Sequence, residues 1–214
     1  MILSTRAQQL YTEITNPEAK LGDLRNIAKG IKKDPLLANE LWATGKLYPR
    51  LLAILILDKK ELNAEVIENL FRDMQVHQFD ERTQLADWLM TNQLTKDRKT
   101  LALMDSWENS AIALQRRIFW YHQARLRWTG QTPPDNTKQL LAAIEEKMLG
   151  EKPEVQWAMN FTAAWIGIFD EPYRDQCMEI GEKLGLYKDQ VVPKNCHPDY
   201  LPKFIESEVQ KRNS

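Results

Sequence analysis

The stretch GDLRNIAKGIKK, residues 22–33, decides the fold class of this chain. Its apolar residues Leu24, Ile27, Ala28 and Ile31 recur at intervals of three and four, with charged residues between them. This spacing places the apolar side chains on one face of an α-helix and the charged ones on the other. The stretch therefore predicts an amphipathic helix that packs through one face.

The same period recurs along the rest of the chain. The apolar stripes within residues 140–148 and 177–184 repeat it, and residues 47–57 are apolar on nearly every side, which is typical of a helix packed on several sides. No run alternates with a period of two for long enough to predict a strand. The predicted helices span residues 3–15, 22–33, 35–44, 46–58, 62–74, 78–93, 96–108, 111–129, 136–149, 153–169, 172–185 and 199–212.

Local signals for helix ends agree with these ranges. Asp34-Pro35 reads as an N-cap followed by proline at the first helical position, and Thr95 precedes a helix expected to start at Lys96. Gly45 and Gly130 mark helix ends. About a dozen short helices with short loops predict an all-α fold, an α-solenoid of stacked antiparallel helix pairs forming a HEAT-like or armadillo-like superhelix with a concave groove. We expect one domain over residues 1–214, because no long linker interrupts the pattern.

Composition limits the function classes. Hydrophobic residues make up 43% and charged residues 28%, which is a globular balance, and only 8 glycines argue against a turn-rich β fold. The formal net charge of −1 counts against nucleic-acid binding by bulk charge, but it leaves open a local basic face.

Metal and membrane sites are not expected. The histidines at positions 77, 122 and 197 have no metal-ligand spacing, and we expect no metal or other cofactor. Cys177 and Cys196 read as free thiols of a reducing, cytoplasmic protein, and the Cys196-His197 pair as structural or surface residues. The N-terminus lacks the order of a signal peptide, and residues 51–57 are too short an apolar run to span a bilayer.

The predicted helix over residues 111–129 combines arginines with aromatic residues. Arginine suits phosphates and aromatic rings suit bases, but arginines beside a buried aromatic stripe more often pair with acids of a neighbouring helix. We place that structural interpretation ahead of nucleic-acid contact. The residues concerned are Arg116, Arg117, Arg125, Arg127, Phe119, Trp120, Tyr121 and Trp128.

Two further features have structural interpretations of their own. Asp80 begins a predicted helix, where a carboxylate most often caps the helix or interacts with its dipole. Trp157 and Phe161 lie four residues apart and so share one helix face, where packing is the ordinary role.

Several phrases together resemble the AlkD-like DNA alkylation repair family, from about residue 20 to the C-terminus. They are DLRNIAK (23–29), ELWATG (40–45) continuing to RLLA (50–53), SWEN (106–109) with LQRR (114–117), QWAMN (156–160), IGEKLG (180–185) and the ending around residues 196–202. The resemblance implies HEAT-like helix pairs. It also implies a DNA glycosylase, a hydrolase that removes cationic alkylated purines such as 3-methyladenine and 7-methylguanine from duplex DNA in the concave groove. We expect the protein to be a monomer.

The resemblance also implies site residues. The family's catalytic aspartate ends a Trp-Asp-x-x-Asp phrase that aligns with residues 76–80, so Asp80 would stabilise the developing oxocarbenium ion without a general acid. Arg116, with Arg117 beside it, would hold a phosphate next to the lesion. Phe161 and Trp157 would line the lesion cleft. The sequence departs from the family pattern at Val76 and at Phe161, where active members carry tryptophans.

Three hypotheses follow from these residues. The first is the glycosylase just described. The second is a family member that binds DNA, such as a distorted or branched form, without base excision, as Val76 and Phe161 suggest. The third is an interaction module with a protein partner in the groove, as the balanced charge suggests.

Overall fold

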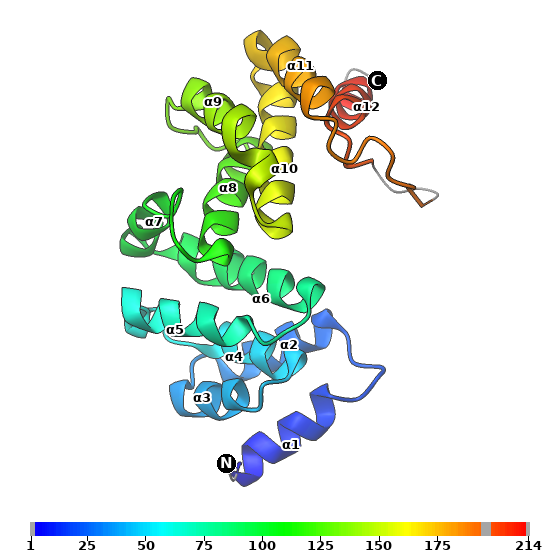
Figure 1. Ribbon diagram of the computed structural model, residues 1–214. Helices are drawn as coiled ribbons and strands as arrows, with labels where there is room; N and C mark the ends of the chain where they lie inside the picture. The colour runs from blue at the N-terminus through cyan, green and yellow to red at the C-terminus, as the bar shows by residue number, and fades with distance from the viewer. Residues whose placement is uncertain (1–2, 194–197, 213–214) are drawn as a thin grey trace. The chain divides into compact units, whose positions relative to one another are not determined.

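The computed structural model describes residues 3–193 and 198–212, and this part of the chain is helical without a β-strand. Residue packing divides the chain into two compact units, residues 1–106 and 107–214. The all-α fold expected from the sequence is confirmed (Figure 1).

The first unit, unit 1, is built from seven α-helices among its described residues, and two short 3₁₀ turns, Lys59–Glu61 and Leu94–Lys96, lie between them. Helix α4 packs against α2, α3 and α6, and α5 packs against α6. The helices are α1 (Thr5–Ile14), α2 (Leu21–Ile31), α3 (Pro35–Ala43), α4 (Leu47–Ile56), α5 (Ala64–Met74), α6 (Phe79–Asn92) and α7 (Arg98–Asp105).

A buried arginine ties three helices of unit 1 together. Arg50 on α4 donates from Nε to the Trp42 carbonyl at 3.2 Å and from Nη1 to the Asp73 carbonyl at 2.6 Å. Its guanidinium lies 4.7 Å from the centre of the Trp42 ring, whose Nε1 donates to an Asp73 carboxylate oxygen at 2.7 Å. Burial lowers the pKa of Arg50, and Asp73 opposes that shift. Burying the guanidinium charge of Arg50 costs free energy, and its two hydrogen bonds and its contact with the Trp42 ring offset that cost.

The second unit, unit 2, is organised around α10, which packs against α8, α11 and α12. Thr162 on α10 donates to the Trp120 carbonyl of α8 at 2.6 Å, so the two helices are joined by a buried hydrogen bond as well as by apolar contact. Its described helices are α8 (Ala113–Trp128), α9 (Thr137–Lys147), α10 (Pro153–Phe169), α11 (Arg174–Leu184) and α12 (Leu201–Arg212), with 3₁₀ turns at Met148–Gly150 and Glu171–Tyr173.

The predicted helix boundaries agree with the structure to within three residues. The clearest difference is at α7, which begins at Arg98 rather than Lys96. Residues 94–96 form a 3₁₀ turn, and the Asp97 side chain accepts from the Lys99 amide, so Asp97 is the N-cap instead of Thr95. None of the helices, within the described ranges, is long and apolar enough to cross a membrane.

Candidate functional site

Asp80 lies in the first turn of α6 in unit 1 and is exposed. Its carboxylate has no hydrogen-bond partner among the described residues, whereas its carbonyl accepts from Thr83 at 3.0 Å. Two exposed apolar neighbours precede it, because Val76 is 77% exposed and Phe79 is 40% exposed. The Asp80 carboxylate is therefore exposed and unpaired, so a ligand could contact it.

The next acid along α6 is already engaged. Glu81 meets Nδ1 of His77 at 2.6 Å, and the His77 ring is buried. The other ring nitrogen of His77, Nε2, is buried and has no hydrogen-bond partner within the described chain. Asp80 and Glu81 are adjacent in sequence, but only Asp80 presents an unpaired carboxylate.

Arg116 on α8 in unit 2 is bound on three sides. Its Nε and Nη2 donate to the two carboxylate oxygens of Glu151 at 2.9 and 2.7 Å, and its Nη1 donates to the Ser110 carbonyl at 2.6 Å. Both charged side chains are 17% exposed. This two-point geometry is the one that arginine offers a phosphate, so Glu151 occupies the place of the expected DNA contact.

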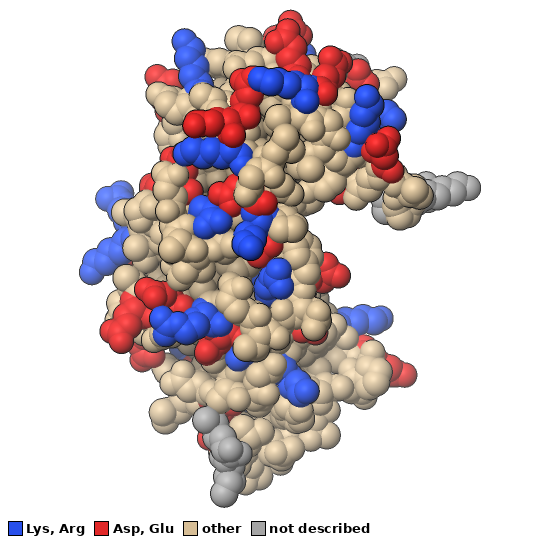
Figure 2. All heavy atoms as spheres, in the orientation of Figure 1, with Lys and Arg blue, Asp and Glu red and all other residues tan. Residues whose placement is uncertain are grey.

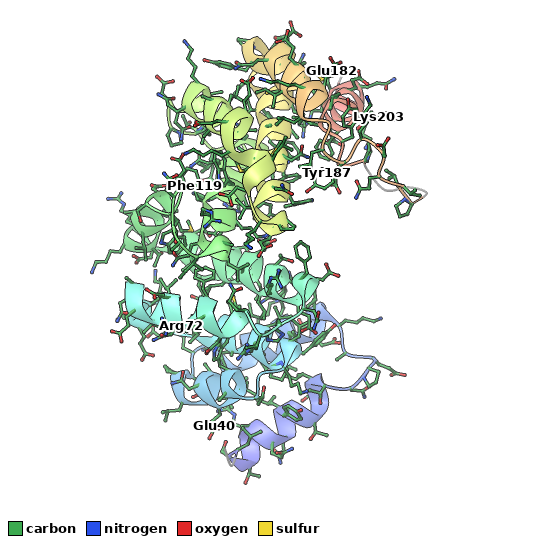
Figure 3. The ribbon with its side chains drawn as sticks, viewed as in Figure 1. Glu40, Arg72, Phe119, Glu182, Tyr187 and Lys203 are labelled. Atoms are coloured by element: carbon green, nitrogen blue, oxygen red, sulfur yellow. The ribbon has the colours of Figure 1, made fainter. Side chains whose placement is uncertain are left out.

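Arg117 is buried beside aromatic rings of unit 2. Its Nη1 donates to the Glu154 carbonyl at 3.0 Å, and its guanidinium lies 4.7 Å from the Trp157 ring centre and 5.8 Å from that of Tyr121. Tyr187, which Figure 3 labels, follows α11 and belongs to the same surroundings. Burial raises its pKa to about 12, with Asp199 adding to the shift and Arg117 opposing it.

Four aromatic residues at intervals of four, Trp157, Phe161, Trp165 and Phe169, form a stripe along α10, here called the aromatic stripe. Ring centres of successive members are 4.8, 5.8 and 5.4 Å apart, and the first and last pairs are stacked. The stripe runs from half-buried Trp157 to Phe169, which is 40% exposed. Further rings pack against it from Tyr121 and Trp128 on α8 and from Phe204 on α12.

Arginines lie at both ends of the aromatic stripe. Arg117 covers Trp157 at one end, and the exposed Arg212 of α12 lies 4.5 Å from the Phe169 ring centre and 5.5 Å from that of Trp165 at the other. The indole Nε1 of Trp165 is buried and has no hydrogen-bond partner in the described residues. A surface of this kind can stack planar groups and place a cation beside them.

The structure brings four of the five predicted site residues together in unit 2. Trp157 contacts both Arg117 and Phe161, and Arg116 precedes Arg117 on the same helix. The fifth predicted residue, Asp80, belongs to unit 1. Trp165, Phe169 and Arg212 were not among the residues expected at the site. The interval of four in residues 157–169 was the sequence signal for the two aromatic residues.

Other candidate chemistry is limited. Within residues 3–193 and 198–212, no cluster of three or more His, Cys, Asp or Glu side chains could hold a metal ion. Cys177 is a buried free thiol, and burial raises its pKa to about 12, which keeps it protonated and unreactive. Cys196 and His197 lie outside the described residues. Figure 2 shows basic and acidic side chains interspersed over the face drawn.

Comparisons with known proteins identify the family and the fold of this chain. The family described as DNA alkylation repair enzyme matches residues 19–176, and no curated protein matches the chain. One solved structure covers 98% of this chain and 88% of its own with a TM-score of 0.66 at 20% identity, and it is described as "A new family of proteins related to the HEAT-like repeat DNA glycosylases with affinity for branched DNA structures". That likeness shows a shared HEAT-like fold, and the family match covers most of the chain. The chain therefore belongs to the DNA alkylation repair enzyme family.

Proposed function

We propose that this protein binds DNA and prefers branched DNA to a linear duplex. The family supports a DNA substrate, and the similar structure is described as having affinity for branched DNA. The observation that carries the proposal is the aromatic stripe of α10 with Arg117 and Arg212 at its two ends.

The physical argument concerns what a branch point offers. Bases at a branch are less completely stacked than bases within a duplex, and each base that stacks on an aromatic side chain contributes about 1–3 kcal/mol. Phe169 is exposed and Trp157 and Phe161 are half-buried, so rings along the stripe remain accessible. Since the net charge is −1, binding depends on local cations such as Arg212 rather than on the charge of the whole chain.

The test is fluorescence anisotropy with a four-way junction, a fork and a linear duplex of matched sequence. We expect tighter binding of the branched forms and a loss of affinity as salt rises. Failure to bind any of the three at low salt would refute the proposal.

A second candidate function, excision of cationic alkylated purines, is favoured by the unpaired carboxylate of Asp80. A negative charge beside the sugar stabilises the oxocarbenium-like transition state, and a methylated purine is already a good leaving group. Two features oppose it, namely the exposure of Val76 and Asp80 to water and the pairing of Arg116 with Glu151. Release of 7-methylguanine from methylated duplex DNA that disappears in Asp80→Asn would support excision, and its absence in the wild type would exclude excision of that lesion.

A further inference from the structure

The C-terminal ends of α2, α4 and α6 lie side by side at one edge of unit 1. The Asp34 amide, just after α2, donates to the Ile56 carbonyl at the end of α4 at 3.0 Å. Gln93, just after α6, donates from Nε2 to the Ile54 carbonyl at 2.6 Å. The loops that follow these three helices therefore form a continuous row.

This row of loops and the first turn of α7 together carry seven exposed cations, here called the basic edge. Neighbouring loops are tied together, because Lys33 Nζ donates to Asp58 at 2.8 Å and Lys59 Nζ donates to the Lys96 carbonyl at 3.3 Å. Figure 2 shows basic side chains projecting over the α7 region at the left. The basic edge consists of Lys32, Lys33, Lys59, Lys60, Lys96, Arg98 and Lys99.

Most acidic residues of the same loops accept hydrogen bonds from nearby residues of these loops. Asp58 accepts from Lys33 and from the Lys60 amide, and the hydrogen bond from Lys33 is the main cause that lowers the pKa of Asp58. Asp97 accepts from the Lys99 amide, and Glu61 adds one exposed carboxylate. The ammonium groups of Lys60 and Lys99 form no ion pair within 4 Å that involves a described carboxylate, although the charge of Lys60 contributes to the lowered pKa of Asp58.

The stability of the fold does not explain all of these cations. Lysines that follow a helix C-terminus interact favourably with its dipole, as Lys33 can. Arg98 and Lys99 instead occupy the first turn of α7, where the positive end of the dipole disfavours cations. Lys32 has a φ of 66°, a conformation that is strained for a residue with a side chain.

A cavity of about 510 Å³ lies on the basic edge, and Lys59, Lys60 and Lys99 line it. One acidic residue, Asp97, is also part of the lining, and the other lining residues are Leu62, Asn63, Ala64, Thr100 and Leu103. Three ammonium groups around one hollow suit an anion with several oxygens. Because packed helices are separated by roughly 8–10 Å, the three loops span roughly 20 Å. One DNA strand presents about six phosphates over that length.

We propose that the basic edge binds the phosphate backbone of one arm of branched DNA. The inference rests on the proposed function and adds a second contact surface to it. Helix α6 has 14 residues and is therefore about 20 Å long, so the basic edge lies at the opposite end of α6 from Asp80. A branched molecule has a further arm that can lie on the basic edge while the rest of the DNA contacts the other end of this helix.

The test compares two triple variants that change net charge equally. One is Lys59→Gln, Lys60→Gln and Lys99→Gln on the basic edge. The matched control is Lys138→Gln, Lys188→Gln and Lys203→Gln, three exposed lysines of unit 2, of which Lys203 is labelled in Figure 3. Junction and linear-duplex affinities are measured over a range of salt, and urea unfolding checks that each variant folds.

We expect the basic-edge triple to lower the salt slope for the four-way junction by about three and to weaken junction binding roughly tenfold, with a smaller effect on the linear duplex. Equal effects of the two triples would mean that only net charge matters and would overturn the inference. Wild-type binding that the basic-edge triple leaves unchanged would also overturn it while the proposed function stands, and absence of wild-type binding would overturn both. Lys32→Gly offers a second check, because relief of the strained φ should raise stability while junction affinity falls.

Discussion

Arg116 and Glu151 form a two-point ion pair across 35 residues of sequence, with donor–acceptor distances of 2.9 and 2.7 Å. The pair joins the start of α8 to the turn before α10, and only 17% of each side chain is exposed. A DNA phosphate could reach Arg116 only by displacing Glu151.

Glu151→Gln should therefore change stability and DNA binding in opposite directions. We expect the free energy of unfolding to fall by about 1–2 kcal/mol, because a charge-assisted hydrogen-bond pair is weakened. DNA affinity should rise, with a salt slope steeper by about one, because the guanidinium is released for a phosphate. Urea unfolding and anisotropy measure the two effects. Arg116→Gln breaks the same pair without releasing a cation, so a gain in affinity there would contradict this explanation.

Phe169→Ala tests the aromatic stripe at its exposed end. We expect the binding free energy for the junction to weaken by about 1–3 kcal/mol if a base stacks there. The free energy of unfolding should fall less than for a fully buried ring, because Phe169 is 40% exposed although it stacks on Trp165. The matched control is Leu149→Ala, which removes another exposed apolar side chain of unit 2 that is 56% exposed. Equal binding by both variants would show that Phe169 makes no contact with DNA.

Gly181→Ala should disturb the packing of α12 against α11. A methyl group at position 181 would lie 2.6 Å from Pro202 Cδ and 2.9 Å from Leu201 Cβ, so α12 must shift. We expect a loss of about 1–3 kcal/mol in stability. Gly22→Ala is the control, because nothing lies within 4 Å of its added methyl group, and a gain of about 0.5 kcal/mol is expected there. Thermal unfolding of the two variants would show opposite shifts in Tm.

Alkaline pH should destabilise the protein through Cys177. Burial raises the pKa of its thiol from 9.0 to about 12, so above pH 9 the unfolded chain releases a proton that the folded chain retains. The stability contributed by the protonated thiol is therefore complete below pH 9 and is lost between pH 9 and 12, with roughly 1.4 kcal/mol lost by pH 10. Tyr187 acts in the same direction above pH 10. Urea unfolding of Cys177→Ala at pH 8 and pH 10 should show a smaller pH dependence than the wild type.

The sequence predicts the helices of this fold well, because apolar periodicity and capping residues lie within or next to each helix. Asp34 caps α3 by accepting from the Leu37 amide, with Pro35 in the first turn as its position implies. The range 153–169 agrees with α10 at both ends. The 3₁₀ turns that shorten α7 and α11 were missed, because their residues have the composition of an ordinary first helical turn.

The sequence predicted the contacts of the candidate site less completely than the helices, because these contacts join residues that lie far apart along the chain. The sequence predicted acids of a neighbouring helix as partners for the arginines of α8. Arg116 pairs with Glu151 in the turn before α10, and Arg127 pairs with Asp170 at the C-cap of α10. Which acid pairs with which arginine depends on how the helices pack, and no local period encodes it. The role of Asp80 in catalysis stays a prediction.

The two cations at the start of α7 have a consequence for engineering. A selection for heat resistance would favour acidic replacements of Arg98 and Lys99, because these relieve an unfavourable interaction with the helix dipole. The same replacements would remove positive charge from the surface proposed to hold a DNA arm. Thermostabilised descendants of this protein should thus drift away from nucleic acid, and a library screened for both traits would retain basic residues at these two positions.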